Sequence, residues 1–396
     1  MEQRLPRFLA DLRALVEIES GSYTKDGVDR VGDWMAGRLE ALGAGIARHP
    51  HAELGDDIVA TFEGSADGPT VMLVGHADTV FDSGYLARRP FEQRGDMVLG
   101  PGTSDMKSGL LAGLYALEIL RTLDEGGAWL PVGRLVYVLN GDEEIGSPVS
   151  TPLIAELART ADVAFVLEAG RANGDIVSQR KGMMHLRATV EGRAAHAGVE
   201  PENGRSATLE AAHKTIALHA LNGRWPGVTV NVGELRGGTR PNIVAESCVM
   251  TIDLRAASAS TQDEAEAAIR AILSSATVAE VRTTVEVLGH TRPMEKTAAS
   301  AELVEAAVAI AGQLGFALAD AATGGSSDAN TTAAAGVPSL DGLGPVGGND
   351  HTPEEYVRVS SIVPRTTLLA ALLLVAGSAG RDIQREKVLP QRSQTV

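Results

Sequence analysis

The stretch "TVMLVGHAD", Thr70–Asp78, contributes most to defining the fold. Its Val- and Leu-rich run is short and does not alternate with polar residues, which is typical of a strand buried on both faces of a parallel sheet. Two similar runs follow, "RLVYVLN" at 134–140 and "VAFVL" at 163–167, with amphipathic helical patterns between them. The sequence therefore predicts an α/β fold with a mostly parallel sheet. Ligands of such sheets gather beyond the carboxyl ends of the strands.

A different sequence pattern begins after Gly182 and predicts a smaller, inserted domain. The segment "MMHLRATVEG" alternates apolar and polar residues, and the following patterns read as helix, strand, strand, helix and strand up to 291. This order is typical of a ferredoxin-like α+β domain with an antiparallel sheet. The α/β pattern then resumes. We therefore expect a main domain over 1–182 and 292–396, with an inserted domain over 183–291.

The charge balance argues against two classes of partner. The chain of 396 residues has 35 Lys+Arg and 51 Asp+Glu, which gives a net charge of −16. Nucleic acids and anionic membranes would both repel such a chain, so we expect neither as a partner.

Cysteine content and hydropathy predict a cytoplasmic protein. The lone cysteine, Cys248, lies in the alternating run "ESCVMTIDL", is expected in a buried strand, and rules out an internal disulfide. The amino-terminal "MEQRLPRFLADLRALVEI" lacks the apolar stretch of a signal peptide, and we find no run of about 20 apolar residues elsewhere.

Imidazoles and carboxylates follow several of the predicted strands. His76 and Asp78 come after the first run, Glu143 and Glu144 after the second, and Glu168 after the third. A glycine-rich loop and a polar loop add Asp105 and His351. Two imidazoles with several carboxylates suit Zn²⁺, and a dense group of carboxylates at a buried strand edge needs cations to neutralise it. We expect a two-metal site in which each ion has one imidazole and one terminal carboxylate, and Asp105 lies between the ions. Its ligands are His76, Asp105, Glu144, Glu168 and His351.

The glycine-rich loop "GPGTSDMKSG", Gly100–Gly109, has an alternative reading as a phosphate loop. Met106 stands where that motif needs glycine, and Asp105 would repel a phosphate, so we favour the metal reading. Adjacent glutamates in "GDEE" suggest divided roles, with Glu144 a ligand and Glu143 the base that takes a proton from water. Taken alone, "GDEE" would read as a solvated acidic turn. Asp78 is expected to orient His76 through its second ring nitrogen.

Eight motifs in order resemble a known family over nearly the whole chain: "VGHADTV", "GPGTSDMKSG", "NGDEEIGS", "VLEAG", "RAAHAG", "TRPNIVAE", "TGGSSDA" and "DHTPEEYV". This is the di-zinc exopeptidase family that includes bacterial glutamate carboxypeptidase, acetylornithine deacetylase and succinyl-diaminopimelate desuccinylase. The resemblance implies a zinc-peptidase catalytic domain with an inserted dimerisation, or lid, domain. It implies two Zn²⁺ per chain, with Co²⁺ or Mn²⁺ as substitutes, and the ligands and base given above. It also implies a cis peptide between Asp105 and Met106.

Within the family the motifs look closest to glutamate carboxypeptidases, which implies hydrolysis of the amide bond before a C-terminal glutamate or a similar N-acyl amino acid. The expected substrate-binding residues are Arg292, Asn242, Arg255, Gly324 and Gly325. An arginine suits a carboxylate because its planar fork forms two parallel hydrogen bonds. Arg255 reads equally well as a surface strand residue. The nature of the acyl group stays open.

Two other functions compete with this one. The first is an N-acyl amino-acid deacylase of the acetylornithine deacetylase or desuccinylase type. The second is a non-catalytic metal-dependent binding protein, which Glu143 argues against because a binder needs no base beside its ligands.

His196, in "GRAAHAG", lies far in sequence from every expected metal ligand. Taken alone it reads as an ordinary turn histidine. The resemblance implies instead that it stabilises the oxyanion of the reaction, from the opposite subunit of a homodimer formed by residues 183–291.

Overall fold

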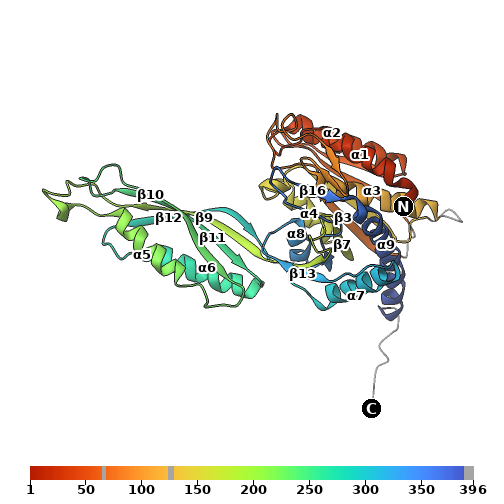
Figure 1. Ribbon diagram of the computed structural model, residues 1–396. Helices are drawn as coiled ribbons and strands as arrows, with labels where there is room; N and C mark the ends of the chain where they lie inside the picture. The colour runs from red at the N-terminus through yellow and green to blue at the C-terminus, as the bar shows by residue number, and fades with distance from the viewer. Residues whose placement is uncertain (65–67, 124–128, 388–396) are drawn as a thin grey trace, which may run out of the picture. The chain divides into compact units, whose positions relative to one another are not determined.

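The computed structural model describes residues 1–64, 68–123 and 129–387, with side chains up to residue 377. The chain forms two compact units (Figure 1). The larger comprises Met1–Ser178, Lys296–Ala322 and Ser327–Val396, and the smaller comprises Gln179–Glu295 and Thr323–Ser326. The smaller unit is thus an insertion that begins and ends within a few residues of the span expected from the sequence.

The larger unit has a six-stranded sheet in the order β1-β2-β6-β3-β7-β14. β6, β3, β7 and β14 run parallel, whereas β1 and β2 add an antiparallel edge. The central strands are buried along almost their whole length, as their uninterrupted apolar runs predict. Their bounds are β1 Gly45–His49, β2 Asp57–Glu63, β3 Thr70–His76, β6 Arg134–Asn140, β7 Val163–Val166 and β14 Ser339–Leu340.

The helices of this unit fall into two groups. The first group, α1, α2, α3, α7 and α9, packs together around α3 and α9. In the second group α4 packs on α8, which contacts β3, β7 and β14. The α-helices are α1 Leu5–Val16, α2 Lys25–Ala41, α3 Ser108–Thr122, α4 Thr151–Ala158, α7 Ala298–Gln313, α8 Asp328–Ala334 and α9 Val359–Lys387. Short helical turns cover Glu2–Arg4, Thr103–Lys107 and Glu143–Ile145.

A small antiparallel sheet, in the order β15-β16-β5-β4, joins residues 347–358 to the strand before the glycine-rich loop. Its strands are β4 Glu92–Arg94, β5 Met97–Leu99, β15 Gly347–Gly348 and β16 Tyr356–Arg358. β8 Ile176–Arg180 and β13 Asp320–Thr323 lie where the chain passes between the units.

One segment of α9, Val359–Gly377, is long and apolar enough to pass for a membrane span by length and composition. Its side chains Ile362, Leu368 and Leu372 belong to the core of the larger unit, and Arg365 is fully buried within it. We therefore interpret α9 as a core helix.

The smaller unit follows the predicted order of strand, helix, two strands, helix and strand. Its sheet has the order β10-β11-β9-β12 and is antiparallel throughout. α5 and α6 pack together against this sheet (Figure 1). Cys248 is buried in β11, as expected. The bounds are β9 Gly182–Glu191, α5 Ala207–His219, β10 Thr229–Gly237, β11 Ser247–Ala256, α6 Ala259–Ser274 and β12 Arg282–Thr291, with a short turn at Pro201–Asn203. The α/β fold with an inserted ferredoxin-like unit is thus confirmed.

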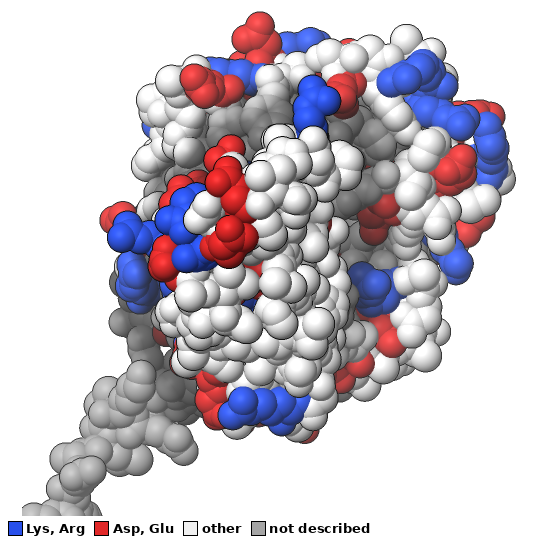
Figure 2. All heavy atoms as spheres, turned by 90° about the vertical axis from the view of Figure 1, so that its left-hand side faces the viewer, with Lys and Arg blue, Asp and Glu red and all other residues white. Residues whose placement is uncertain are grey.

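The surface carries both signs of charge. The face drawn in Figure 2 shows Lys and Arg side chains in small groups mixed with Asp and Glu, with uncharged surface between them.

Candidate metal centre

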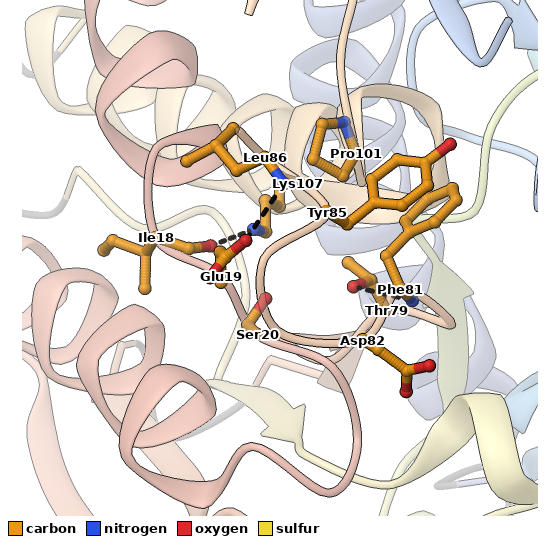
Figure 3. A pocket seen from close by; sticks show the side chains of 10 residues that line it. All are labelled: Ile18, Glu19, Ser20, Thr79, Phe81, Asp82, Tyr85, Leu86, Pro101 and Lys107. Carbon is orange, nitrogen blue, oxygen red and sulfur yellow. Dashed lines mark hydrogen bonds between the residues drawn. The ribbon is translucent and has the colours of Figure 1, made fainter. Parts of the chain in front are cut away.

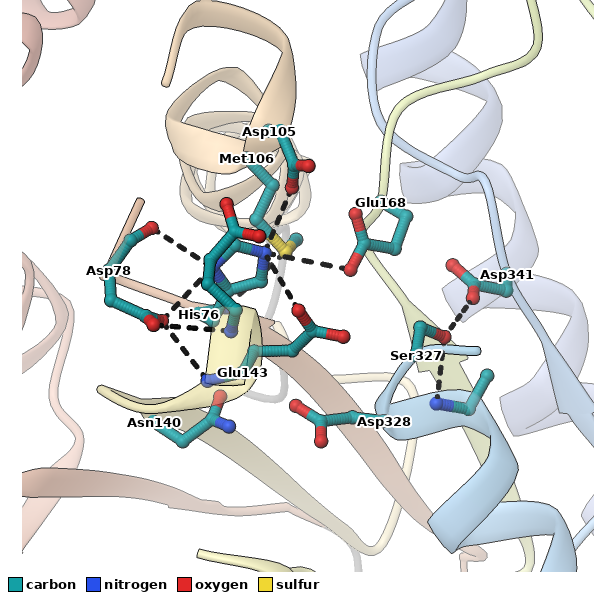
Figure 4. A network of polar contacts seen from close by, with 12 residues as sticks. His76, Asp78, Asp105, Met106, Asn140, Glu143, Glu168, Ser327, Asp328 and Asp341 are labelled. Carbon is teal, nitrogen blue, oxygen red and sulfur yellow. Dashed lines mark hydrogen bonds and ion pairs between the residues drawn. The ribbon is translucent and has the colours of Figure 1, made fainter. Parts of the chain in front are cut away.

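The first half of the site is built around His76, the last residue of β3. Its Nε2 lies 3.0 Å from Oδ1 of Asp105 and 3.6 Å from Oε1 of Glu168. Asp105 comes from the glycine-rich loop before α3, and Glu168 follows β7, the strand next to β3. In Figure 4 both carboxylates point towards the imidazole.

The second half is built around His351, from the loop before β16. Its Nε2 lies 3.1 Å from Oδ2 of Asp105 and 3.0 Å from Oε2 of Glu144. Asp105 therefore turns one carboxylate oxygen to each imidazole. The structure brings together all five side chains that the sequence predicts as ligands.

The donor set fits two zinc ions. Neighbouring ligand atoms of a tetrahedral Zn²⁺ site, each about 2.0–2.1 Å from the ion, lie about 3.3 Å apart. The four distances above, 3.0–3.6 Å, are close to this spacing. The ligand atoms of His76, Asp105 and Glu144 also lie within 4.8 Å of one another. The larger unit thus contains a candidate metal-binding cluster with a shared central carboxylate.

Asp78 positions His76 and the main chain of the two glutamates. His76 Nδ1 lies 3.1 Å from its carbonyl oxygen and 3.3 Å from its Oδ1, and both are acceptors. Nδ1 therefore carries a hydrogen, and a metal ion bound at the site would be held by Nε2. The Asp78 carboxylate also accepts the main-chain N–H groups of Glu143 and Glu144, each at 3.2 Å. A further donor is Ser22 Oγ at 2.6 Å, which sequence reasoning missed.

Glu143 lies beside the ligands. Its Oε2 is 4.0 Å from His76 Nε2, and Figure 4 shows its side chain directed towards the imidazole. Burial raises the pKa of Glu143 well above its usual range, and the charges of Glu168 and Asp328 add to this effect. A carboxylate with a raised pKa holds a proton more readily, which is the property that a general base near neutral pH requires.

The free site is electrostatically unbalanced without cations. Burial, with repulsion from Asp105, raises the pKa of Glu168 to about 8. Burial also raises the pKa of Glu144. Hydrogen bonds to Asp105 and Glu144 raise the pKa of His351 to about 11. Without metal ions, protons therefore occupy the same carboxylates and imidazole that are expected to bind the metal.

These shifts predict that the chelated protein is less stable at high pH. Glu168 and His351 have folded-state pKa values above the model-peptide values of about 4.3 and 6.5. From pH 6 to 9 the folded chelated protein therefore holds more protons than the unfolded chain, so its free energy of unfolding falls as pH rises. We expect its melting temperature in EDTA to be lower at pH 8.5 than at pH 6.

The control is the same scan with Zn²⁺ present. Metal ions displace the protons, so zinc should restore more stability at pH 8.5 than at pH 6. A chelated protein that gains stability between pH 6 and pH 8.5 would contradict the electrostatic account.

The residues expected to bind substrate belong to the smaller unit. Arg292 forms a forked ion pair with Asp263 of α6, at 2.5 and 3.1 Å. Arg255 pairs with Asp253 of its own strand at 3.0 Å. Gly324 and Gly325 are exposed, and the carbonyl of Gly325 accepts a hydrogen bond from Arg180 at 3.1 Å. Their roles stay predictions.

His196 and Asn242 are neighbours in this unit although they are far apart in sequence. The Ala197 N–H donates to the Asn242 carbonyl at 3.0 Å, and His196 forms a bridge with Ile243. Both His196 and Asn242 are exposed.

Besides Ser22, sequence reasoning missed three polar side chains that support the site. Asp328 is buried at the start of α8 and accepts a hydrogen bond from Ser147 Oγ at 2.7 Å. Glu355 is buried at the start of β16. The sequence did point to two of them, since Asp328 lies in the motif "TGGSSDA" and Glu355 in the motif "DHTPEEYV". Neither motif says which partner the side chain meets.

Lys107 is the third of these residues and anchors the end of the glycine-rich loop. Its Nζ is buried and donates to the carbonyl of Leu15 at 3.0 Å and to that of Ile18 at 2.8 Å. Figure 3 shows the contact with Ile18. Burial lowers the pKa of Lys107 to about 7. The side chain borders a cavity of about 10 Å³, which is room for about one water molecule.

Similarity to known proteins agrees with this geometry. The model of peptidase family M20/M25/M40 matches residues 72–375. Carboxypeptidase G2 of Pseudomonas sp. is 31% identical over 95% of this chain and 90% of its own length. Acetylornithine deacetylase of Edwardsiella ictaluri is 26% identical over 94% of this chain and 98% of its own. The crystal structure of aminopeptidase PepT from Bacillus cereus has the same fold, with a TM-score of 0.78, 22% identity and coverage of 94% and 98%.

Proposed function

The chain belongs to peptidase family M20/M25/M40, and from this premise we propose that it is a zinc-dependent carboxypeptidase. Its reaction would be hydrolysis of the amide bond before a C-terminal glutamate or a similar N-acyl amino acid. The observation that carries the proposal is the pairing of each imidazole with one oxygen of Asp105, with Glu143 beside the pair. Similarity to carboxypeptidase G2 supports the substrate class.

The proposed cofactor is a pair of Zn²⁺ ions, for which Co²⁺ or Mn²⁺ should substitute. His76 and Glu168 would hold one ion, His351 and Glu144 the other, and Asp105 both. Bound there, the ions would supply positive charge that lowers the pKa of water and polarises the scissile carbonyl.

The protein's own residues have two further roles in the proposed reaction. Glu143 takes a proton from the attacking water and returns it to the nitrogen of the leaving amine. Asp78 fixes the His76 ring and, through their N–H groups, the main chain of both glutamates. One buried carboxylate thus positions a ligand and the base together.

Substrate recognition is assigned to the smaller unit. We propose that Arg292, Asn242 and Arg255 contact the substrate's carboxylate end, with Gly324 and Gly325 allowing the main chain to approach it. Arg292 is partnered by Asp263 on the surface. Binding a substrate carboxylate therefore requires Arg292 to exchange one carboxylate partner for another.

We further propose a homodimer formed through the smaller unit in the cytoplasm. β10 is an edge strand of its sheet and carries the exposed Leu235, and the neighbouring α5 exposes Leu209 and Ile216. An unpaired edge beside apolar side chains favours pairing with a second copy about a twofold axis.

A substrate panel tests the proposed function. With zinc-loaded protein, we expect N-acyl-glutamates to be hydrolysed with higher kcat/KM than N-acetylornithine or N-succinyl-diaminopimelate. The alternative, an N-acyl amino-acid deacylase, is favoured by the similarity to acetylornithine deacetylase. Indifference to a C-terminal glutamate would favour that alternative, and no amidase activity on any substrate would favour a binding protein.

A further inference from the structure

Glu355 places a buried carboxylate against the main chain of the glycine-rich loop. Only 1% of this residue is exposed. Its Oε1 accepts the N–H groups of Ser104 and Asp105, at 2.8 and 3.1 Å, and its Oε2 accepts the N–H of Gly102 at 3.1 Å. All three donors lie at or immediately before the residue whose side chain faces both imidazoles.

The loop needs such a partner because its main chain is irregular there. Gly102 has a φ of +73°, and Asp105 has non-helical angles within the turn Thr103–Lys107. Buried N–H groups without a regular helical partner must be satisfied by another acceptor. A carboxylate can satisfy three at once, and charged acceptors form stronger hydrogen bonds than neutral ones.

The same residue also ties this loop to the loop that carries His351. The Gly100 N–H donates to the Glu355 carbonyl at 3.4 Å, and Tyr356 pairs with Leu99 in the small sheet. His351 lies four residues before Glu355 in sequence. Glu355 therefore joins the segments that present Asp105 and His351, whose side chains meet at 3.1 Å.

The other end of the glycine-rich loop has a separate anchor. Lys107 donates to the carbonyls of Leu15 and Ile18, and α3 begins at the next residue. Loss of the Glu355 contacts should therefore release Gly102–Asp105 without detaching α3 or its packing. This separation lets a substitution at Glu355 report on the position of Asp105.

We propose that Glu355 is a positioning residue that holds Asp105 midway between the two metal positions and in register with His351. This inference rests on the proposed two-metal function. Glu355 does not face the metal ligands with its own carboxylate. It acts through the main chain of the residue that does.

The test is Glu355→Gln, with Glu354→Gln as its matched control. Glutamine has nearly the same size, but its amide nitrogen cannot accept the Gly102 N–H and would face it donor to donor. Glu354 is the preceding residue, its side chain is 64% exposed, and it forms a 3.7 Å ion pair with Arg89. Its substitution removes the same charge from the same loop.

Metal binding is the decisive measurement. We expect Glu355→Gln to weaken binding of Zn²⁺ or Co²⁺ by roughly 10- to 100-fold, as is usual when a residue that orients a ligand is lost. Co²⁺ titrations should also show a changed visible absorption and weaker magnetic coupling between the two ions, because Asp105 no longer lies between them. Glu354→Gln should behave as the unsubstituted protein does.

The outcomes separate the two proposals. If the unsubstituted protein does not bind two ions, the proposed function fails. If it does, and Glu355→Gln binds both with unchanged affinity and spectrum, the positioning role is wrong, even if the melting temperature falls. Should Glu355→Gln fail to fold, Glu355→Asp keeps the charge on a shorter side chain and must show the same weakening, and unchanged binding would again overturn the inference.

Discussion

Replacing Glu143 with alanine is expected to reduce turnover by roughly 10²- to 10⁴-fold, the usual effect of losing a general base. Both metal ions should stay bound, because each keeps its imidazole, its terminal carboxylate and Asp105, although Glu143 itself lies 4.0 Å from His76 and close to Glu168. The KM for substrate should change little, since the lost interaction belongs to the reaction step. Steady-state kinetics and metal analysis of the purified variant measure both effects.

Glu144→Ala is the matched control. Glu144 lies 3.0 Å from His351 and is expected to hold a metal ion, so its loss should remove metal as well as activity. The reverse result, with zinc lost from Glu143→Ala and kept by Glu144→Ala, would show that the roles of the two glutamates are exchanged.

The metal centre could be predicted from the sequence because parallel strands end at one edge of their sheet. His76 and Glu168 follow adjacent parallel strands, and Glu144 follows β6 on the other side of β3. Once the strands are recognised, the sheet itself brings these side chains together. Asp105 and His351 come from loops, so their inclusion rested on chemistry and on the resemblance to a family.

Other features depend on contacts that no local pattern reveals. The antiparallel edge formed by β1 and β2 is one, because β2 is as apolar and buried as its parallel neighbours. The role of Glu355 is another, since its partners are main-chain N–H groups about 250 positions earlier in the chain. Main-chain donors leave no residue type in the sequence to search for.

The ion pair of Arg292 is a third feature that could not be predicted from the sequence. The sequence marks it as a carboxylate-binding residue, but it cannot show that Asp263 of α6 already supplies a carboxylate. That partner lies 29 positions away and is exposed. Pairing of surface side chains depends on how α6 and β12 are placed in the smaller unit, which periodicity alone does not determine.

The structure shows which ring nitrogen of His196 can donate a hydrogen bond. The Gly198 N–H donates to its Nδ1 at 3.2 Å. In the neutral imidazole Nδ1 is then the acceptor, so the hydrogen resides on Nε2. The side chain is exposed, and the main chain on both sides of it is hydrogen-bonded to the segment that carries Asn242. The loop that carries His196 is therefore fixed to the segment that carries Asn242.

His196→Ala is accordingly expected to lower turnover by roughly 10²- to 10³-fold, as loss of an oxyanion donor usually does. Its metal content should not change, because no expected ligand lies in the smaller unit. His290→Ala is the control, since His290 belongs to the same unit and lies near Glu266, at 3.5 Å. Nearly full activity is expected of that variant.

Mixing two inactive variants tests whether His196 acts in the active site of the partner subunit. In a homodimer in which each site uses the partner's His196, chains with His196→Ala and chains with Glu143→Ala complement each other. Random pairing of equal amounts places one intact site in half of the dimers, so activity should recover to at most about a quarter of that of the unsubstituted protein. Subunit exchange is verified separately, with differently tagged chains. If the chains exchange and activity does not return, His196 acts within its own chain or has no part in the reaction, because a residue that crosses the interface must restore one site in every mixed dimer.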